Sequence, residues 1–329
     1  MPSIITDRSR VWLALLTIYV VWGSTYLGIA VAIETIPPFL MGAIRFVAAG
    51  LLLLAWARVR WGPAFQAPSR GEWRDALIVG ALLFGGGNGL VGWGEQTVPS
   101  GIAALLIALV AVWFAIFSRV FLRDRIPLIV ALGIGVGIAG VGLLVWPAGG
   151  TTGFDPAGVA ALIAAPICWA GGSIFAARRA RLPRLPIVAS AIQMLAGGAV
   201  LAVEGVATGE LSRLTPAVSG ASLLALGYLV VFGSLVAFTA YSWLLRHAPL
   251  PLIGTYAFVN PVVAVILGAL ILSEPITPRT VLAAAVIVGG VALVILGRSR
   301  LRAGQTSAPT TVAPKAPTAI VPKPASDAA

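Results

Sequence analysis

Apolar stretches of roughly 20 residues follow one another from residue 11 to residue 297, and they limit the possible fold more than any other feature. A helix of that length crosses the hydrocarbon core of a bilayer, which is about 30 Å thick. Only 10% of the residues are charged, against about 25% in soluble domains. The chain is therefore predicted to be an all-α integral membrane protein without a soluble domain.

The apolar stretches predict ten transmembrane helices. Most of the connections between them are short and contain Pro, Gly or charged residues, which are typical of breaks between elements. The first stretch is too long for the apolar part of a cleavable signal peptide and is taken as a membrane helix. The expected helices cover 11–32, 38–57, 74–94, 99–120, 126–146, 157–177, 187–206, 221–245, 251–272 and 278–297.

The basic residues indicate the orientation of the chain. If the N-terminus is cytoplasmic, all but three of the 22 Lys and Arg residues fall on the cytoplasmic side, and the exceptions are Arg45, Arg213 and Arg279. Cytoplasmic loops of membrane proteins carry such an excess. The distribution predicts that both termini are cytoplasmic. It also accounts for the net charge of +11, so no nucleic-acid partner is expected.

The chain repeats itself. Residues 99–126 align without gaps with 249–276 at a shift of 150, and AIRFVAAG at 43–50 aligns with AIQMLAGG at 191–198 at a shift of 148. Each repeat has five helices, and because five is an odd number the second repeat enters the membrane inverted. Inverted repeats are common in secondary transporters, whose binding sites lie near the midplane between the repeats.

Four regions follow from this organisation: a cytoplasmic N-terminus at 1–10, a first repeat at 11–146, a second at 157–297 and a tail at 298–329. The tail is rich in Ala, Pro and Thr and is too poor in large apolar residues to bury a core. It is expected to be a disordered cytoplasmic segment.

The stretch GNGLVG at 87–92 matches the glycine fingerprint of dinucleotide-binding turns, and GVGIAG at 135–140 matches it again. That fingerprint requires a preceding strand and a following acidic residue, and both matches lie inside apolar segments. Dinucleotide binding is therefore excluded. The glycines instead indicate close helix packing, bending of the helix, or both.

Small and polar residues follow one face of the third segment at α-helical spacing: Ala81, Gly85, Asn88, Gly92 and either Glu95 or Gln96. Polar groups that face lipid have no partner. This face is therefore expected to contact protein or a water-filled cavity.

Arg45 lies about 10 Å inside the second segment, as judged from the rise of a helix. A charge at this depth is usually paired or faces an aqueous path. Glu95 and Glu34 lie near the same side of the membrane and are its candidate partners. Two interpretations remain open: a structural ion pair between helices, and a gate or substrate role, in which Arg45 and Glu95 would form an outer gate or coupling site.

Aromatic and amide side chains within the segments are the candidates for a substrate cavity. Trp22 and Trp169 occupy related positions in the two repeats, and the amides can serve as hydrogen bonds between helices as well as substrate contacts. The predicted wall consists of Trp22, Tyr26, Asn88, Trp93, Trp169, Gln193, Tyr256 and Asn260. No Asp or Glu lies in the middle of a segment, which favours neutral or zwitterionic cargo.

The sequence lacks the patterns of an enzyme. His247 is the single histidine and lies at the end of a segment, and the single cysteine, Cys168, is expected to pack as a small apolar residue. We expect no catalytic residue, no metal site and no cofactor. With no ATP-binding motif, energy must come from a gradient or from the substrate itself.

With these features the chain resembles the drug/metabolite transporter superfamily, specifically its ten-helix EamA-domain exporters, over about residues 11–297. The stretches that carry the resemblance are VWGSTYLGI (21–29), PPFLMGAIRFVAAGLLLL (37–54), GNG with EQTVPSGIAALL (87–106) and YAFVNPVVAVILGALILSEPI (256–276). One departure is Ala111, where the family often has a proline opposite Pro261.

The resemblance implies a monomeric exporter of the bacterial inner membrane, similar to exporters of amino acids, including aromatic ones. Its partners would be small-molecule substrates, namely amino acids, and the lipid bilayer. Other cargo remains an alternative: drug-like cations, sugars or nucleotide derivatives, although a phosphorylated molecule would need more deep cations than Arg45. A membrane scaffold without transport is a second alternative, and a membrane enzyme is disfavoured.

Overall fold

The computed structural model describes residues 4–123, 126–145, 154–214, 217–248, 252 and 255–306. Within these ranges the regular structure is helical and no residue lies in a strand. Nine helical spans in this part of the chain are long and apolar enough to cross a membrane, and one further apolar helix is shorter. The all-α membrane architecture predicted from the sequence is confirmed.

Helices occupy each of the ten predicted segments. In order they are α1 (Ile4–Ile33), α2 (Pro38–Trp61), α3 (Arg70–Gly80) with η2 (Ala81–Gly89) and α4 (Leu90–Gly94), α5 (Ser100–Ile107) with α6 (Val110–Leu122), α7 (Leu128–Val145), α8 (Pro156–Arg178), α9 (Pro186–Ala207), α10 (Gly220–Tyr228) with η4 (Leu229–Val236) and α11 (Ala237–His247), α13 (Tyr256–Ile271) and α14 (Pro278–Thr306). Short 3₁₀ turns follow α2 and α9, at Gly62–Ala64 and Glu210–Arg213.

Two helices extend beyond the predicted membrane segments, whose candidate spans in the structure are Ser9–Ile33 and Pro278–Gly297. Helix α1 already begins at Ile4, inside the expected N-terminal segment 1–10, and α14 continues to Thr306, past the predicted start of the tail at 298. Hydropathy marks only the part of a helix that fits the bilayer, and α14 extends beyond that part. The rest of the predicted disordered tail, 307–329, lies outside the described residues.

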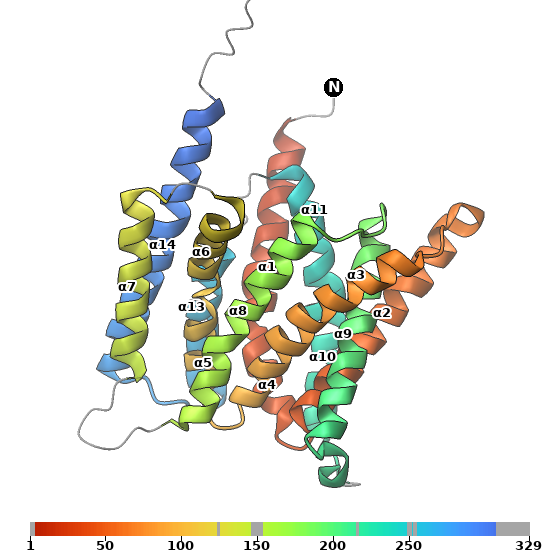
Figure 1. Ribbon diagram of the computed structural model, residues 1–329. Coiled ribbons are helices and arrows are strands. Elements are labelled where there is room, and N and C mark those ends of the chain that lie inside the picture. Colours follow the sequence, from red (N-terminus) through yellow and green to blue (C-terminus); the bar gives the residue numbers. More distant parts are fainter. Residues whose placement is uncertain are drawn as a thin grey trace, which may run out of the picture.

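The helices form a bundle in which α7 and α14 lie along one side, α2 and α9 lie along the other, and α1, α5, α8 and α13 lie between them (Figure 1). Helix α1 begins and α14 ends at the same end of the bundle. This arrangement agrees with an even number of crossings.

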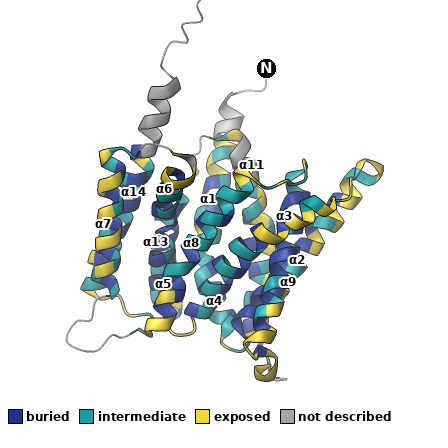
Figure 2. Cartoon of the chain, in the orientation of Figure 1, coloured by how far each residue is buried: buried dark blue, intermediate teal, exposed yellow. Residues whose placement is uncertain are grey.

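Side chains that point out of the bundle are largely apolar. Figure 2 shows the exposed residues along the outer faces of the peripheral helices. They include Leu51 on α2, Leu132 on α7, Leu270 on α13 and Leu282 on α14, all more than half exposed. Such faces are stable against lipid and would be costly in water, so the bundle is built to sit in a bilayer.

The two repeats contact one another reciprocally at α7 and α14. A Cβ added at Gly140 would lie 2.9 Å from the Ile287 amide nitrogen, and one added at Gly290 would lie 2.5 Å from the Gly137 amide nitrogen. At the sequence shift of 150, Gly140 matches Gly290 and Gly137 matches Ile287. The same contact thus occurs twice, as a two-fold axis between the repeats requires, and glycine allows the backbones to approach.

The third helix of each repeat contains a π-helical stretch. These stretches, η2 at Ala81–Gly89 and η4 at Leu229–Val236, begin at positions that match at the shift of 148. A π-helix has wider turns than an α-helix and is frequent at functional sites. The face predicted for the third segment contacts both protein and a cavity: Gly85 packs against Val200 of α9, whereas Asn88 lines the cavity.

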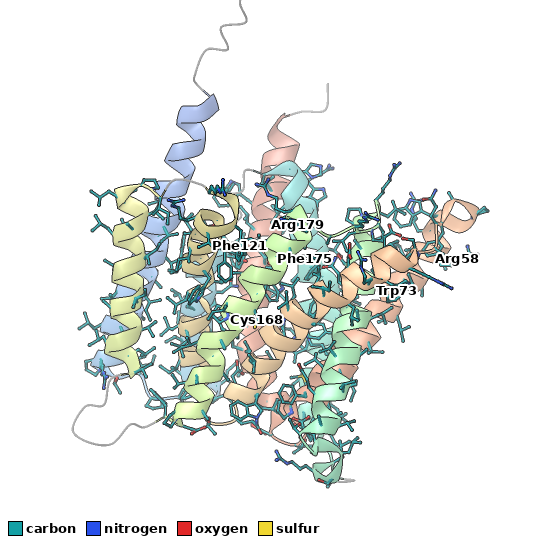
Figure 3. The ribbon with its side chains drawn as sticks, viewed as in Figure 1. Arg58, Trp73, Phe121, Cys168, Phe175 and Arg179 are labelled. Carbon is teal, nitrogen blue, oxygen red and sulfur yellow. The ribbon has the colours of Figure 1, made fainter. Side chains whose placement is uncertain are left out.

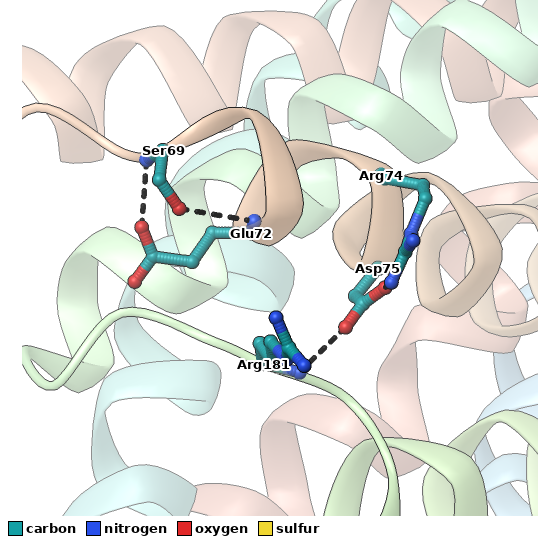
Figure 4. A network of polar contacts seen from close by, with 5 residues as sticks. All are labelled: Ser69, Glu72, Arg74, Asp75 and Arg181. Carbon is teal, nitrogen blue, oxygen red and sulfur yellow. Dashed lines mark hydrogen bonds and ion pairs between the residues drawn. The ribbon is translucent and has the colours of Figure 1, made fainter.

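A polar network fixes the start of α3 (Figure 4). Ser69 and Glu72 form a reciprocal capping box at the first turn. Asp75 is 3% exposed and accepts a hydrogen bond of 2.7 Å from the Arg181 backbone nitrogen, and its carboxylate pairs with Arg74 at 2.9 Å. The network connects the third helix of the first repeat to the segment before α9.

Candidate functional site

A cavity lies between the two repeats and is lined by side chains from both. It encloses about 820 Å³ of space free of atoms, part of it open to solvent. Its lining comes from α1, α2, α8, α9 and α13, from both π-helical stretches and from the helices next to them. Six of the eight predicted wall residues line it: Trp22, Tyr26, Asn88, Trp169, Tyr256 and Asn260.

Trp93 and Gln193 are not among the lining residues, so the structure does not bring these two predicted wall residues to the cavity. Trp93 packs instead against the apolar cluster that contains Phe39 and Leu201. Gln193 is partly buried on α9, where its neighbour Met194 faces the cavity. Adjacent residues of a helix point in different directions, and the sequence alone did not reveal which of the two faces inward.

Trp22 is held in the wall by several contacts. Its Nε1 donates a hydrogen bond of 3.2 Å to the Gly233 carbonyl oxygen of η4. Its ring lies 5.2 Å from Tyr241, 5.3 Å from Tyr256 and 6.3 Å from Phe238, measured between ring centroids. Because a ring enclosed in this way has little freedom, Trp22 offers a fixed aromatic surface.

A chain of aromatic rings continues from Trp22 across the cavity. Phe238 lies 6.5 Å from Phe84, and Phe84 lies 4.5 Å from Phe46. Phe84 belongs to η2 and Phe238 follows η4, so this series of ring contacts connects the two π-helical stretches. The cavity therefore has an extended aromatic wall to which both repeats contribute.

The two asparagines bind backbone carbonyls with their amide nitrogens. Asn88 Nδ2 donates to the Leu83 carbonyl oxygen at 3.1 Å, within η2. Asn260, in the amide orientation that satisfies its hydrogen bonds, donates to the carbonyl oxygens of Tyr19 at 3.3 Å and Tyr256 at 3.2 Å. Both amides thus support the backbone around the cavity while they line it.

Arg45 lines the cavity and is 5% exposed. Its Nε donates to the hydroxyl oxygen of Ser234 at 3.1 Å, and its Cζ lies 4.8 Å from the centre of the Phe46 ring. A Cβ added at Gly233 would lie 3.0 Å from Arg45 Nη2, so the missing side chain at Gly233 leaves room for the guanidinium. Arg45 is the one charged side chain among the described lining residues.

The ion pair expected between Arg45 and Glu95 or Glu34 is not formed. Among the described residues, the ion pair is the one between Arg74 and Asp75, and it does not involve Arg45. Glu34 is exposed, and Glu95 is 8% exposed with neither carboxylate oxygen in a hydrogen bond. Glu95 interacts electrostatically with Arg45 without contacting it, so the gate they were predicted to form stays a prediction.

Several lining residues were missing from the predicted wall. Ser234 and Phe238 lie on η4 and just after it, and their small and aromatic side chains follow Gly227 at helical spacing, which is a usable signal. The others are apolar and resemble core residues in sequence. The missed residues include Thr25, Phe46, Phe84, Met194, Ser234 and Phe238.

Cys168 lies on α8 near the middle of the bundle, and Arg179 lies by the end of that helix (Figure 3). A Cβ added at Gly86 would lie 2.7 Å from the Cys168 sulfur, so this thiol packs on η2 as a small side chain. Among the described residues no group of three His, Cys, Asp or Glu side chains is placed to hold a metal ion.

A family model of EamA-like transporters matches residues 10–146 and 156–296, which are the two repeats. The chain belongs to the EamA-like transporter family. It is 40% identical over 298 residues to the inner membrane transporter YedA of Escherichia coli (strain K12), covering 90% of this chain and 94% of that protein. It is 24% identical to the transporter YvbV of Bacillus subtilis (strain 168), over 87% of this chain and 92% of that one.

A solved structure described as "Crystal structure of protein" has the same fold. It superposes with a TM-score of 0.61 at 25% identity and covers 89% of this chain and 99% of that chain. The family, YedA and YvbV are named as transporters and not as enzymes. The resemblance seen in the sequence is thereby confirmed at the level of the family, and this EamA protein is a multi-pass membrane transporter.

Proposed function

We propose that this protein is an inner-membrane carrier that exports small metabolites and that amino acids are its main substrates. The name of YedA supports the inner membrane, since that relative shares most of its length with this chain. Both repeats of one chain contribute to the cavity, so a monomer contains a whole site.

One observation carries the choice of substrate: among the described lining residues, the cavity combines a long aromatic wall with one buried cation, Arg45. Aromatic rings offer a large apolar surface for amino-acid side chains. The cation disfavours drug-like cations, because like charges repel each other strongly at low dielectric. A phosphorylated cargo would carry more negative charge than one arginine can balance.

The two π-helical stretches support alternating access. They occur at matching positions, they line the cavity from opposite repeats, and their wide turns are weak points in otherwise regular helices. A change in η2 would open one side of the cavity, and the equivalent change in η4 would open the other. Inverted repeats of secondary transporters move around a fixed site in this manner.

The gate or coupling role of Arg45 and Glu95 is retained as part of the proposal. Glu95 is enclosed after the end of α4 without a hydrogen-bond partner. An enclosed carboxyl group of this kind is sensitive to whether water reaches it. Opening of the outer side would bring water to Glu95 and change its charge near Arg45.

The proposed function is tested by flux through purified protein in liposomes. Vesicles loaded with one radiolabelled amino acid are diluted into unlabelled amino acid, with aromatic, aliphatic and charged species in the panel and with or without a pH gradient. We expect exchange of several neutral amino acids, fastest for those with large side chains. Absence of flux for every amino acid, from protein that elutes as a folded species, would refute amino acids as the cargo.

A further inference from the structure

We propose that the guanidinium of Arg45 binds the carboxylate of the transported substrate, so that the cavity selects molecules with a carboxylate and rejects the matching amines and amides. The inference rests on the proposed carrier function, because it assigns the ligand chemistry of the same cavity. Its test measures binding separately from flux, so that the two can fail independently.

Most of the donors of Arg45 are free of protein acceptors. A guanidinium carries one N–H on Nε and two on each Nη, and it accepts no hydrogen bond. Within the described residues its hydrogen bond is the one from Nε to Ser234 Oγ, at 3.1 Å. The N–H groups of both Nη atoms are therefore left for whatever occupies the cavity that Arg45 lines.

The protein supplies no anion at this point. No carboxylate oxygen of a described residue lies within ion-pair distance of Arg45. Glu95 acts on it only from a distance. Burying a charge without a partner is unfavourable by several kcal/mol even after relaxation of the protein. A ligand carboxylate in the cavity removes this unfavourable situation.

The guanidinium is held in a fixed orientation. Ser234 binds it at Nε, its Cζ lies over the Phe46 ring, and Gly233 leaves the space that its Nη2 fills. The hydrogen bond and the ring contact restrict rotation of the side chain. The outer edge with two Nη atoms is the remaining recognition edge, and its planar geometry fits the two oxygens of a carboxylate.

Other parts of the cavity suit the rest of an amino acid. Asn88 uses its amide nitrogen for the Leu83 carbonyl, which leaves its amide oxygen as an acceptor for an ammonium group. Trp22 and Trp169 line the same cavity and offer ring faces to an ammonium group or to an apolar side chain. A zwitterion thereby finds partners for both of its charges.

The repeats carry this recognition on one side only. Gln193 occupies the position that matches Arg45 at the shift of 148, and it does not line the cavity. The described lining thus holds one cation, which balances one carboxylate.

The test is calorimetric titration of the purified protein with four ligands that share a phenyl ring: phenylalanine, phenylalanine amide, phenethylamine and 3-phenylpropionate. We expect the two carboxylates to bind at least about tenfold more tightly than the amide and the amine, because hydrogen bonds between charged groups are stronger than those between neutral groups. Equal binding of all four ligands, or no binding of either carboxylate, would overturn the proposal.

Substitution of Arg45 makes the test specific. Arg45→Gln should weaken phenylalanine binding by about 10- to 100-fold and make the four affinities alike, whereas Arg45→Lys should keep a reduced preference for carboxylates. Thermal unfolding of each variant checks that it is folded, and Gln193→Ala, at the matching position, is the control. If folded Arg45→Gln keeps the full preference for carboxylates, the proposal is wrong.

The outcomes separate the inference from the proposed function. Flux of uncharged or cationic cargo without binding of carboxylates would leave a carrier and remove the inference. Binding of carboxylates that depends on Arg45, without flux of any amino acid, would leave the inference and remove the carrier.

Discussion

At position 45 the first repeat has an arginine that enters the central cavity, whereas the second repeat has Gln193 at the matching position, outside the cavity lining. The backbones around them agree closely, with π-helical stretches that begin at matching positions and reciprocal glycine contacts at α7 and α14. The difference teaches that the repeat symmetry governs the framework and the possible motions, while the chemistry of the cavity departs from symmetry at individual side chains.

A second comparison concerns the two related tryptophans. Trp22 has three aromatic neighbours and a hydrogen bond to η4. Trp169 faces the same cavity and lies against Gly87, and no ring pair involving it is recorded among the described residues. One tryptophan is thus a rigid part of the wall, and the other is supported mainly by packing.

Replacement of the tryptophans should give the largest effect. Trp22→Ala should lower the free energy of unfolding by about 3 kcal/mol, near the lower end for loss of a packed aromatic side chain, because it removes a hydrogen bond and three ring contacts. Trp169→Ala should lower it clearly less. Chemical unfolding in detergent micelles compares the two variants, and equal losses would contradict the difference in support.

The symmetric framework is tested at α14. Gly290→Ala should destabilise the protein by about 1–3 kcal/mol, the usual effect of overpacking, because its Cβ would lie 2.5 Å from the Gly137 amide nitrogen. Its neighbour Gly289 has open space around it and is the matched control. The melting temperature of Gly289→Ala should equal or exceed that of the wild type. A similar loss in both variants would argue against the close contact of α7 and α14.

The role of Arg45, which has no equivalent in the second repeat, is tested through the pH dependence of ligand affinity. Ionised Glu95 would act as a distant counter-ion of Arg45 and weaken carboxylate binding, so affinity should rise as pH falls, by roughly tenfold or less at such a separation. Tyr26 and Glu274 also interact electrostatically with Glu95, and both residues are kept when Glu95 is replaced by Gln. Glu95→Gln should bind carboxylates with the same affinity between about pH 5 and pH 7, where the ligand's own charges do not change.

The control for this titration is Glu34→Gln, since Glu34 is exposed. It should keep the pH dependence of the wild type. If Glu95→Gln and the wild type show the same pH dependence, Glu95 does not act on the Arg45 site.

The smallest effect is expected at Gln193. Gln193→Ala should change the affinity for phenylalanine by less than about twofold, because the side chain does not line the cavity, and surface or peripheral substitutions usually have effects within about 0.5 kcal/mol. A large loss in titration would show that the second repeat contributes a polar group after all and would weaken the comparison with Arg45.

Helix number and the inverted repeat could be predicted from the sequence because both depend on patterns along the chain. Hydropathy marks each crossing, and the alignment at shifts of 148 and 150 marks the repeat. The π-helical stretches could not be predicted, because periodicity at α-helical spacing assumes the α-helical turn. This is why the sequence did not separate Gly85, which packs against α9, from Asn88, which lines the cavity.

The site was predicted in part for a similar reason. Arg45 can be recognised in the sequence because it is a charged residue inside an apolar segment. Its partner cannot be recognised, because the partner depends on distances between helices. Glu95 was chosen by depth in the membrane, whereas the structure brings Ser234 of η4 to the guanidinium. Apolar lining residues such as Phe84 and Met194 have no polar atoms that would distinguish a cavity wall from a core.

The central claim is that the cavity binds an amino acid with its carboxylate on Arg45 and its side chain on the aromatic wall. A crystal structure with 4-bromophenylalanine tests it most directly, since anomalous scattering locates the bromine without ambiguity. The account predicts that the bromine lies among the aromatic rings of the cavity, which include Trp22 and Phe84, and that the carboxylate lies at the Nη edge of Arg45. A ligand bound outside this cavity, or one whose carboxylate points away from Arg45, would contradict it.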